Sequence, residues 1–475
     1  MWVMALESYS QLGNFTVGVR GAIPRSPILN NKSVSHASPE TFSTFSRQSR
    51  FAANALKALD GLRESGRALA LPAQELRARA MGFFAIGCNL GWLAMIYDSS
   101  GIVHHQMDSE EVPPLSGYQV VMSAALANMD TAIAIARLPA ASEAGGFPAP
   151  AQWFGGNAMS ATRFIQLVRS YMARFRAGIA RTPDERTDVD WNAVIADAEN
   201  GLTEDVVVQI GGATGWNGVP GFQDLNGFNQ MGPFIWGFAD VSGGYDAWIA
   251  QGLLDRGDFL IVTPDLRWPA GITREAQTSA TRRTGTYAEL PYVSHSALVV
   301  GGDGWGTSHV YYSRFSYLGR TGGVGAMPEF LKTEVDLLAA EGYLRTNRLI
   351  EAAAKIDLTR VARGGLPAVS GAVTDATQRV PGGANCVPRV PQPPSFSTTA
   401  CGTMLEALKY EKRIELSGVS LGSWFFDARG WGDLVVGTPL EYPVPVPELD
   451  ARLMPYYNLG GGGRSSAIRG TYGFP

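Results

Sequence analysis

The amino-acid sequence predicts a mostly α-helical protein, in which helical hairpins form a scaffold for a loop-rich, irregular subdomain. Apolar residues recur at helical spacing in several blocks before residue 180 and again within 330–361, as amphipathic helices require. Residues 205–325 lack this period and are rich in Gly, aromatic residues and short β-type runs such as VVVQIGG. We therefore expect three parts: an N-terminal helical scaffold (1–204), a loop-rich, aromatic-rich insertion (205–325), and a C-terminal part (326–475) with hairpins and a wrapping tail.

Four helical blocks are expected before the insertion. They cover residues 45–65, 73–97, 115–137 and 157–178. Leu71-Pro72 separates the first two blocks, and a Gly-Gly-Phe-Pro run that starts at Gly145 separates the last two. Proline and glycine interrupt helices, so each pair of blocks is expected to form an antiparallel hairpin.

A further hairpin is expected from helices at 330–345 and 348–361, with a break at Thr346-Asn347. Small residues such as Ala340 and Ala353 would let the two helices approach closely. This pattern is typical of a tetratricopeptide-like hairpin.

The segment 404–434 combines charged residues with large aromatic ones. A charged amphipathic helix breaks at two glycines and runs into two tryptophans; its marked residues are Glu411, Arg413, Glu415, Asp427, Arg429, Trp424 and Trp431. We expect a helix end held by buried carboxylate–guanidinium pairs beneath tryptophans, because arginine can bind a carboxylate bidentately. Arg413 should have a carboxylate partner and Asp427 an arginine partner. Interleaved arginines keep carboxylates ionised, so these residues are assigned to structure rather than catalysis.

This segment resembles the C-terminal signature of the SusD/RagB family, roughly ER-x-x-EL followed by EG-x-R-x-x-DLRRWG. The matching residues are Glu411, Arg413, Glu415, Leu416, Asp427, Arg429, Trp431 and Gly432. The acidic-Gly pair of the family is replaced by Ser-Gly-Val-Ser from Ser417, and the gap to Asp427 is two residues longer, which indicates a divergent branch. The hairpin at 330–367 resembles the family hairpin and its Arg-Gly-Leu ending, with Glu334, Glu341, Arg360, Arg363, Gly365, Leu366 and Pro367 on the pattern and Asp357 in place of Asn.

The resemblance implies nutrient capture at the cell-surface face of a bacterial outer membrane. Such a protein binds an oligosaccharide, or in some branches a peptide, and delivers it unaltered to a TonB-dependent, SusC-like barrel. It needs no cofactor. Family members are usually lipoproteins, but neither a signal peptide nor a lipidated cysteine is visible in the stretch MWVMALESYS.

Aromatic residues of 205–325 are the candidate ligand contacts, because sugar rings pack on aromatic rings while polar neighbours bind hydroxyl groups. We expect ligand-facing residues among Trp216, Trp236, Trp268, Trp305 and Tyr292. The alternative is that most of them form a core, since loops without helices need large residues to bury area. In TPDLRWP (263–269), a structural pair of Asp265 and Arg267 under the tryptophan is favoured over a binding loop.

Composition excludes several classes of protein. Charged residues make up 17% of the 475 residues, below the ~25% of typical globular proteins, and the formal net charge is −4. No Lys/Arg cluster has the density that nucleic-acid binding requires. Low charge with abundant Trp, Tyr and Gly suits an extracellular binding surface.

Cys386 and Cys401 flank a proline-rich loop. A disulfide there would fix a segment with little core of its own and would suit an oxidising compartment. Loop cysteines are as often unpaired when nothing else is known; the export that the resemblance implies favours the pair.

No catalytic residue, metal site or cofactor is expected. The sequence has no G-x-S-x-G motif, and neither His295 nor His309 lies near a nucleophile signature. The adjacent pair His104 and His105 has poor geometry for one metal ion. Two alternative functions stay open: a secreted tetratricopeptide-type scaffold that binds proteins, and a glycan-degrading enzyme, which would need two carboxylates about 5–10 Å apart.

Overall fold

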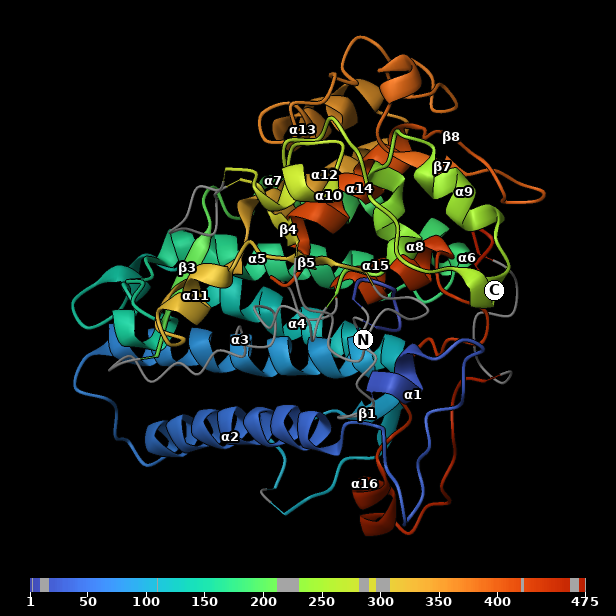
Figure 1. Cartoon of the computed structure of the whole chain (residues 1–475). Helices are drawn as coiled ribbons and strands as arrows, with labels where there is room; N and C mark the ends of the chain where they lie inside the picture. The colour runs from blue at the N-terminus through green and yellow to red at the C-terminus, as the bar shows by residue number, and fades with distance from the viewer. Residues whose placement is uncertain are drawn as a thin grey trace. The chain divides into compact units, whose positions relative to one another are not determined.

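The computed structural model describes residues 1, 3–8, 17–108, 110–211, 230–281, 290–295, 308–419, 423–461 and 470–474 (Figure 1). They form two compact units. The first unit comprises Met1–Arg25, Glu204–Val436 and Ile468–Pro475, and the second comprises Ser26–Thr203 and Gly437–Ala467.

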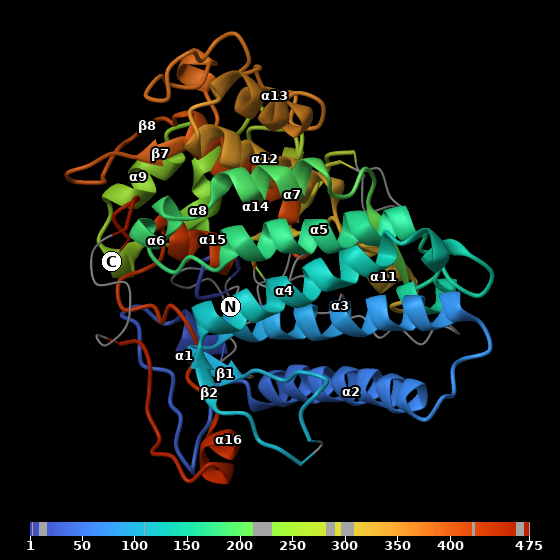
Figure 2. The same ribbon diagram turned by 180° about the vertical axis from the view of Figure 1, so that it is seen from behind.

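The second unit is built from helices that pack in chain order. Its longer helices are α2 (Pro39–Glu64), α3 (Pro72–Ile96), α4 (Tyr118–Ala136), α5 (Ala161–Gly178) and α7 (Trp191–Glu199). Helix α3 packs against α2 and α4, α4 against α5, and α5 against α7, and Figure 2 shows α2 to α5 side by side. The four predicted blocks are confirmed. The largest shift is at α2, which starts at Pro39 rather than at 45 because Pro39 suits the first helical turn.

Shorter elements complete the second unit. They are the 3₁₀ helices η2 (Pro139–Ser142) and η3 (Ala151–Phe154), the helices α6 (Pro183–Thr187) and α16 (Val446–Ala451), and the antiparallel strands β1 (Ser99–Gly101) and β2 (Leu115–Gly117).

Helix α3 depends on glycine for its close contacts. A Cβ atom at Gly91 would lie 2.2 Å from the Phe175 ring of α5, and one at Gly87 would lie 2.8 Å from the Ala125 carbonyl oxygen of α4. Both α3 and α4 are long and apolar enough to cross a membrane by length and composition alone. Of the most apolar 18-residue stretch of each helix, 67% is buried inside the protein in α3 and 39% in α4.

The first unit contains many short elements around one helical hairpin. Before the hairpin lie α1 (Val17–Gly21), β3 (Val206–Ile210), α8 (Pro233–Trp236), η6 (Gly237–Ala239), α9 (Gly244–Ala250), η7 (Leu253–Asp255), α10 (Arg274–Thr278), β4 (Val293–His295), β5 (Val310–Tyr312), α11 (Ser316–Arg320) and β6 (Gly325–Phe330). The hairpin and the elements after it are α12 (Lys332–Arg345), α13 (Leu349–Arg360), η8 (Gly383–Asn385), β7 (Arg389–Pro391), β8 (Thr399–Cys401), α14 (Met404–Leu416) and α15 (Ser423–Trp431).

The predicted hairpin at 330–361 is confirmed. Helices α12 and α13 pack against each other and both contact α14. Ala340 and Ala353 are buried, at 0% and 2% exposure. Asn347 makes the break between the helices in the left-handed conformation, with φ of 60°, which Asn tolerates better than most residues.

Residues 205–325 do not form a part of their own. They share the first unit with the C-terminal hairpin, because β3 near their start pairs with β6 at their end and Asp265–Arg267 binds α14. The second unit ends at Thr203 and the first resumes at Glu204. Strands β4 and β5, of three residues each, pair antiparallel with Val293 opposite Tyr312 and His295 opposite Val310.

Strands β7 and β8 form an antiparallel pair closed by a disulfide between Cys386 and Cys401, with Cα atoms 5.7 Å apart. Replacing both cysteines by alanine should lower the free energy of unfolding by about 3 kcal/mol, because the unfolded chain regains the entropy of a loop of about 15 residues. Urea denaturation of the oxidised protein and the variant measures this loss, with Cys88→Ala as control. Equal denaturation midpoints would contradict the expectation.

Candidate functional site

Two acidic residues on one face of α14 converge on one arginine. Glu411 and Glu415 are a helical turn apart, so they project from the same face. Arg267 Nη1 donates to Glu411 Oε2 at 2.6 Å and to Glu415 Oε1 at 3.0 Å. Its Nη2 donates to Asp265 Oδ2 at 2.8 Å. All four side chains are fully buried, so this is an ion network inside the core.

Further cations and hydroxyl groups occupy the remaining oxygens. Arg363 Nη1 donates to Glu415 Oε2 at 2.6 Å, and the Thr359 hydroxyl donates to Glu411 Oε2 at 2.7 Å. Burial by itself would raise the pKa of Glu415, but Arg314, Arg363 and Arg267 outweigh burial and lower that pKa. The Glu415 carboxylate is buried and ionised, and both its oxygens accept hydrogen bonds from arginines. A substrate therefore cannot reach it. Burial raises the pKa of Glu411, against the opposite effect of Arg267. The network holds α14 to the loops of the first unit, and its carboxylates are closed to solvent.

A second set of buried ion pairs links α14 to α15. Arg413 Nη2 donates to Asp433 Oδ2 at 2.5 Å, and its guanidinium carbon lies 5.4 Å from the centre of the Trp431 ring and 5.7 Å from that of Trp424. Lys412 Nζ binds Asp427 Oδ2 at 2.7 Å. Lys412 of α14 is therefore one partner of Asp427, while Arg413 is directed at Asp433. An arginine partner for Asp427 stays a prediction.

The remaining signature residues are also buried. Trp431 Nε1 donates to Glu341 Oε1 of α12 at 2.9 Å, and Arg429 is 1% exposed, with its guanidinium carbon 4.9 Å from the centre of the Phe426 ring. The signature segment thus ties α14, α15 and the hairpin together.

Three of the expected ligand contacts belong to the core. Trp236, Trp268 and Tyr292 are 1%, 4% and 0% exposed. Their polar ends bind protein groups. Trp236 Nε1 donates to the Glu7 carbonyl oxygen at 2.9 Å, and Trp268 Nε1 donates to the Tyr410 hydroxyl at 3.2 Å. The Tyr292 hydroxyl donates to Glu415 Oε2 at 3.3 Å. The expectation that they face a ligand is wrong, because short helices and loops need these large rings to bury area. Trp216 and Trp305 lie outside the described residues.

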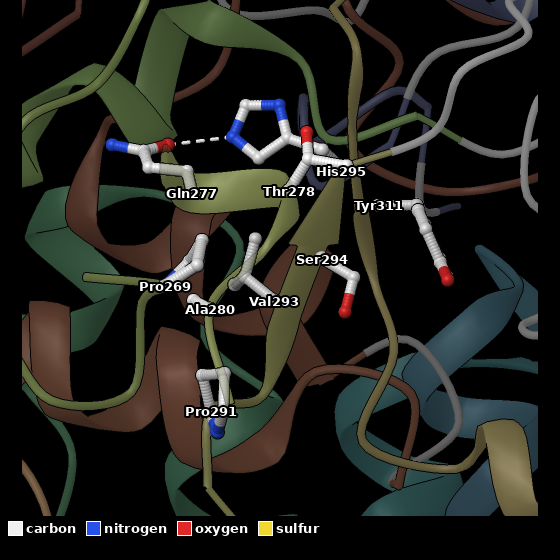
Figure 3. A pocket seen from close by; sticks show the side chains of 9 residues that line it. All are labelled: Pro269, Gln277, Thr278, Ala280, Pro291, Val293, Ser294, His295 and Tyr311. Atoms are coloured by element: carbon white, nitrogen blue, oxygen red, sulfur yellow. Dashed lines mark hydrogen bonds between the residues drawn. The ribbon is translucent and has the colours of Figure 1, made fainter. Parts of the chain in front are cut away.

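A pocket of about 160 Å³ lies beside this core, where α10, β4 and β5 meet (Figure 3). Its described lining consists of Pro269, Gln277, Thr278, Ala280, Pro291, Val293, Ser294, His295 and Tyr311. Prolines and valine supply apolar wall, while hydroxyl, amide and imidazole groups supply hydrogen bonds. The volume is below the ~300–1,000 Å³ of most ligand sites, so the pocket has room for one unit of a longer ligand.

The backbone around the pocket is fixed from both sides. Thr273 caps α10, its hydroxyl accepting from the Ala276 amide at 3.2 Å. Strand β4 follows Tyr292, whose amide donates to the Arg267 carbonyl at 2.8 Å and whose carbonyl accepts from the Ser313 amide at 2.7 Å. The pocket is therefore anchored to the same residues that form the buried ion network. Ser294 and Tyr311 lie opposite each other in the strand pair.

The pocket carries no formal charge on its described lining. Arg274 and Asp258 lie nearby and bind each other at 2.5 Å, and His309 Nδ1 lies 2.7 Å from the same Asp258 oxygen. Among the described residues, no group of three or more His, Cys, Asp or Glu side chains could hold a metal ion. This chemistry suits a neutral ligand rich in hydroxyl groups better than an ion.

The sequence could not reveal most of this lining. Gln277, Ser294 and His295 belong to no motif, and they meet only because α10 lies against β4. Tyr311 is one of many aromatic residues in 205–325. Its place in that segment is the one sequence signal that favours it as a ligand contact.

Comparison with known proteins identifies the fold. No protein-family model matches the sequence, and no curated protein matches it. Among solved structures, a SusD superfamily protein from Bacteroides vulgatus ATCC 8482 matches with a TM-score of 0.55 at 13% identity, over 94% of this chain and 90% of that one. A SusD superfamily protein from Bacteroides fragilis matches with a TM-score of 0.51 at 12% identity, over 94% and 90%. A laminarin-binding SusD-like protein matches with a TM-score of 0.50 at 12% identity, over 97% and 94%.

The chain therefore has the fold of the SusD superfamily, a tetratricopeptide-like helical scaffold with an irregular part. The resemblance seen in the signature segment and the hairpin is confirmed at the level of the fold.

Proposed function

We propose that this protein binds neutral oligosaccharides at a bacterial cell surface and passes them, unaltered, to a SusC-like, TonB-dependent transporter in the outer membrane. The observation that carries the proposal is the pocket whose described lining combines hydroxyl, amide and imidazole groups with an apolar wall and carries no formal charge, set in a fold of the SusD superfamily. Sugars present hydroxyl groups to such polar atoms and C–H faces to apolar walls. One protein of similar fold binds laminarin.

The carboxylates near the pocket support binding without hydrolysis. Glycosidases place two carboxylates about 5–10 Å apart across the scissile bond. Asp258 is held by Arg274 and His309, and Glu411 and Glu415 are fully buried around Arg267. None of these three is poised for acid–base duty, so the enzyme alternative gains no support from the described residues.

Protein binding is a second candidate function, supported by helix α13. Ile350, Leu358 and Val361 are 85%, 54% and 44% exposed. Leu358 follows Ile350 by eight residues, and Val361, the residue directly after α13, follows it by eleven. At helical spacing all three lie on one face. An exposed apolar stripe is typical of a surface that contacts another protein. Replacing Ile350 and Leu358 by serine should abolish binding to a protein partner and leave glycan affinity unchanged.

Calorimetry against a panel of neutral plant, microbial and algal glycans, charged glycans and peptides tests the proposal, with chromatography of each mixture afterwards. We expect one neutral glycan class to bind and no shorter product to appear, because the described lining of the pocket carries no formal charge and no pair of carboxylates. Release of shorter sugars would make the protein an enzyme. Binding to a protein partner alone, with none to glycans, would favour the second candidate.

Delivery to a transporter requires a separate test. Co-expression with a SusC-like barrel encoded by a neighbouring gene, followed by affinity purification in detergent, should recover both proteins together. Recovery of this chain alone would contradict the proposed partner.

A further inference from the structure

Side-chain donors on the α10 side of the pocket are used within the protein. Thr278 Oγ1 donates to the Arg274 carbonyl at 2.7 Å. Gln277 Nε2 donates to the Ile261 carbonyl and to the Gly271 carbonyl, each at 2.9 Å, which takes both hydrogens of the amide. Neither Thr278 nor Gln277 has a side-chain hydrogen left for a ligand.

The imidazole hydrogen of His295 is also used within the protein. His295 Nε2 lies 2.5 Å from Gln277 Oε1, and an amide oxygen only accepts, so Nε2 is the donor. Burial lowers the pKa of His295 to about 4, so at pH 7 the ring is neutral and carries no second N–H group. His295 therefore offers no free donor to a ligand.

On the strand side of the pocket, the Ser294 hydroxyl donates into the core. It lies 2.9 Å from the Ser313 hydroxyl. The single hydrogen of the Ser313 hydroxyl is donated to the Tyr292 carbonyl at 3.1 Å, so Ser294 is the donor in the serine pair. The Ser294 oxygen keeps lone pairs, as does that of Thr278, so both residues present acceptors.

Tyr311 is the lining residue whose hydroxyl stays free to donate. It lies opposite Ser294 in the strand pair and lines the pocket. Its hydroxyl has no hydrogen-bond partner among the described residues, and it is not one of the unpartnered polar atoms closed to solvent, as His295 Nδ1 is. Figure 3 shows the Tyr311 hydroxyl clear of the other side chains that are drawn. The described lining thus combines several acceptors with one free side-chain donor.

We propose that Tyr311 sets the ligand class of this pocket: its hydroxyl donates to one oxygen of a neutral sugar unit, while the hydroxyls of that unit donate to acceptors such as Ser294 Oγ. The inference rests on the proposed function and deepens it, because it gives a reason why acidic sugars would be rejected. A carboxylate only accepts, and it needs several donors when it leaves water. A sugar hydroxyl both donates and accepts.

Tyr311→Phe removes the free donor. Laminarin, followed by the other neutral glycans of the calorimetric panel, should bind this variant about tenfold more weakly than the wild type, since one hydrogen bond is of that size. Tyr456→Phe is the matched control, because the Tyr456 hydroxyl binds Asp450 and Tyr456 is not part of the described lining. Equal glycan affinities of Tyr311→Phe and the wild type would overturn the inference.

The stability of Tyr311→Phe is a second readout. Its urea denaturation midpoint should equal that of the wild type, because the hydroxyl has no partner in the protein to lose. A lower midpoint would show that the hydroxyl is bound inside the protein, and it would also overturn the inference.

Ser294→Ala tests the acceptor side of the pocket. Its matched control is Ser308→Ala, because the Ser308 hydroxyl donates to the Met231 carbonyl at 2.7 Å and Ser308 is not part of the described lining. Each variant loses one internal hydrogen bond, but only Ser294→Ala should bind neutral glycans more weakly, by about tenfold. Equal glycan affinities of the two variants would contradict the role of Ser294 as an acceptor.

Carbon-13 NMR of labelled tyrosine tests the ligand class with monosaccharides as probes. The Tyr311 signal, assigned by its loss in Tyr311→Phe, should shift on titration with glucose, and glucuronate at equal ionic strength should need about tenfold higher concentration for the same shift. Equal shifts with both sugars would overturn the ligand class, and no shift with either would overturn the assignment of Tyr311.

These outcomes separate the inference from the proposed function. If no glycan of the panel binds the wild type, the proposed function fails, and the monosaccharide titration still decides the role of Tyr311. If a neutral glycan binds the wild type and Tyr311→Phe equally well, the inference fails while the proposed function stands.

Discussion

Replacing Arg267 by methionine should lower the free energy of unfolding by about 3–5 kcal/mol. The guanidinium is the shared partner of Asp265, Glu411 and Glu415, and every one of these side chains is fully buried. Methionine fills part of the volume but leaves three carboxylates near one another without this cation. Chemical denaturation followed by circular dichroism measures the loss.

Arg348→Met is the matched control for Arg267→Met. Arg348 binds Glu351 at 2.9 Å, but the two side chains are 46% and 44% exposed, and exposed pairs contribute at most about 1 kcal/mol. A loss at Arg267 no larger than that at Arg348 would show that the buried network does not hold the first unit together.

Replacing Trp236 by alanine should cost about 3–5 kcal/mol of stability, as for other large aromatic residues in cores. Trp236 is 1% exposed, and its ring centre lies 4.8 Å from that of Trp424 and 5.9 Å from that of Trp268. Its Nε1 also donates a hydrogen bond to the Glu7 carbonyl oxygen. Thermal and chemical unfolding of the variant measure the loss, with Trp236→Phe expected to lose less.

The same variant distinguishes a core tryptophan from a ligand contact. Glycan affinity of the folded Trp236→Ala protein, measured well below its denaturation midpoint, should equal that of the wild type. Unchanged stability with lost glycan binding would reverse the assignment and restore Trp236 as a ligand-facing residue.

The helical scaffold could be predicted from the sequence because its apolar residues repeat over many turns. The helices α2 to α5, α12 and α13 are of this kind. Their predicted bounds differ from the observed ones only at the helix ends. Strands β4 and β5 could not be predicted, since three residues show no period. The same limit applies to α10, which has five residues.

The signature segment shows what local sequence can and cannot tell about contacts. Acidic and basic residues interleaved before tryptophans indicated buried pairs, and the structure buries them. The partners were not predictable: Arg267 meets Glu411 from 144 residues away, and Arg413 takes Asp433 rather than a residue of the family pattern. Only the packing of loops on α14 decides these pairs.

The candidate site was predicted least well, for a physical reason. A buried tryptophan and a ligand-binding one look alike in a sequence, because both come from aromatic-rich loops. Trp236, Trp268 and Tyr292 are needed to build a core out of short elements. The pocket lining instead consists of residues such as Gln277 and Ser294, which belong to no sequence motif. Only their positions in the fold bring them to the pocket.

A structure of the protein with the glycan that binds best in the calorimetric panel tests the central claim most directly. The account predicts an intact oligosaccharide with one sugar unit in the pocket, between the apolar wall of Pro269 and Pro291 and the polar groups of Ser294, His295 and Tyr311. A cleaved sugar, or a sugar bound away from this pocket, would contradict it.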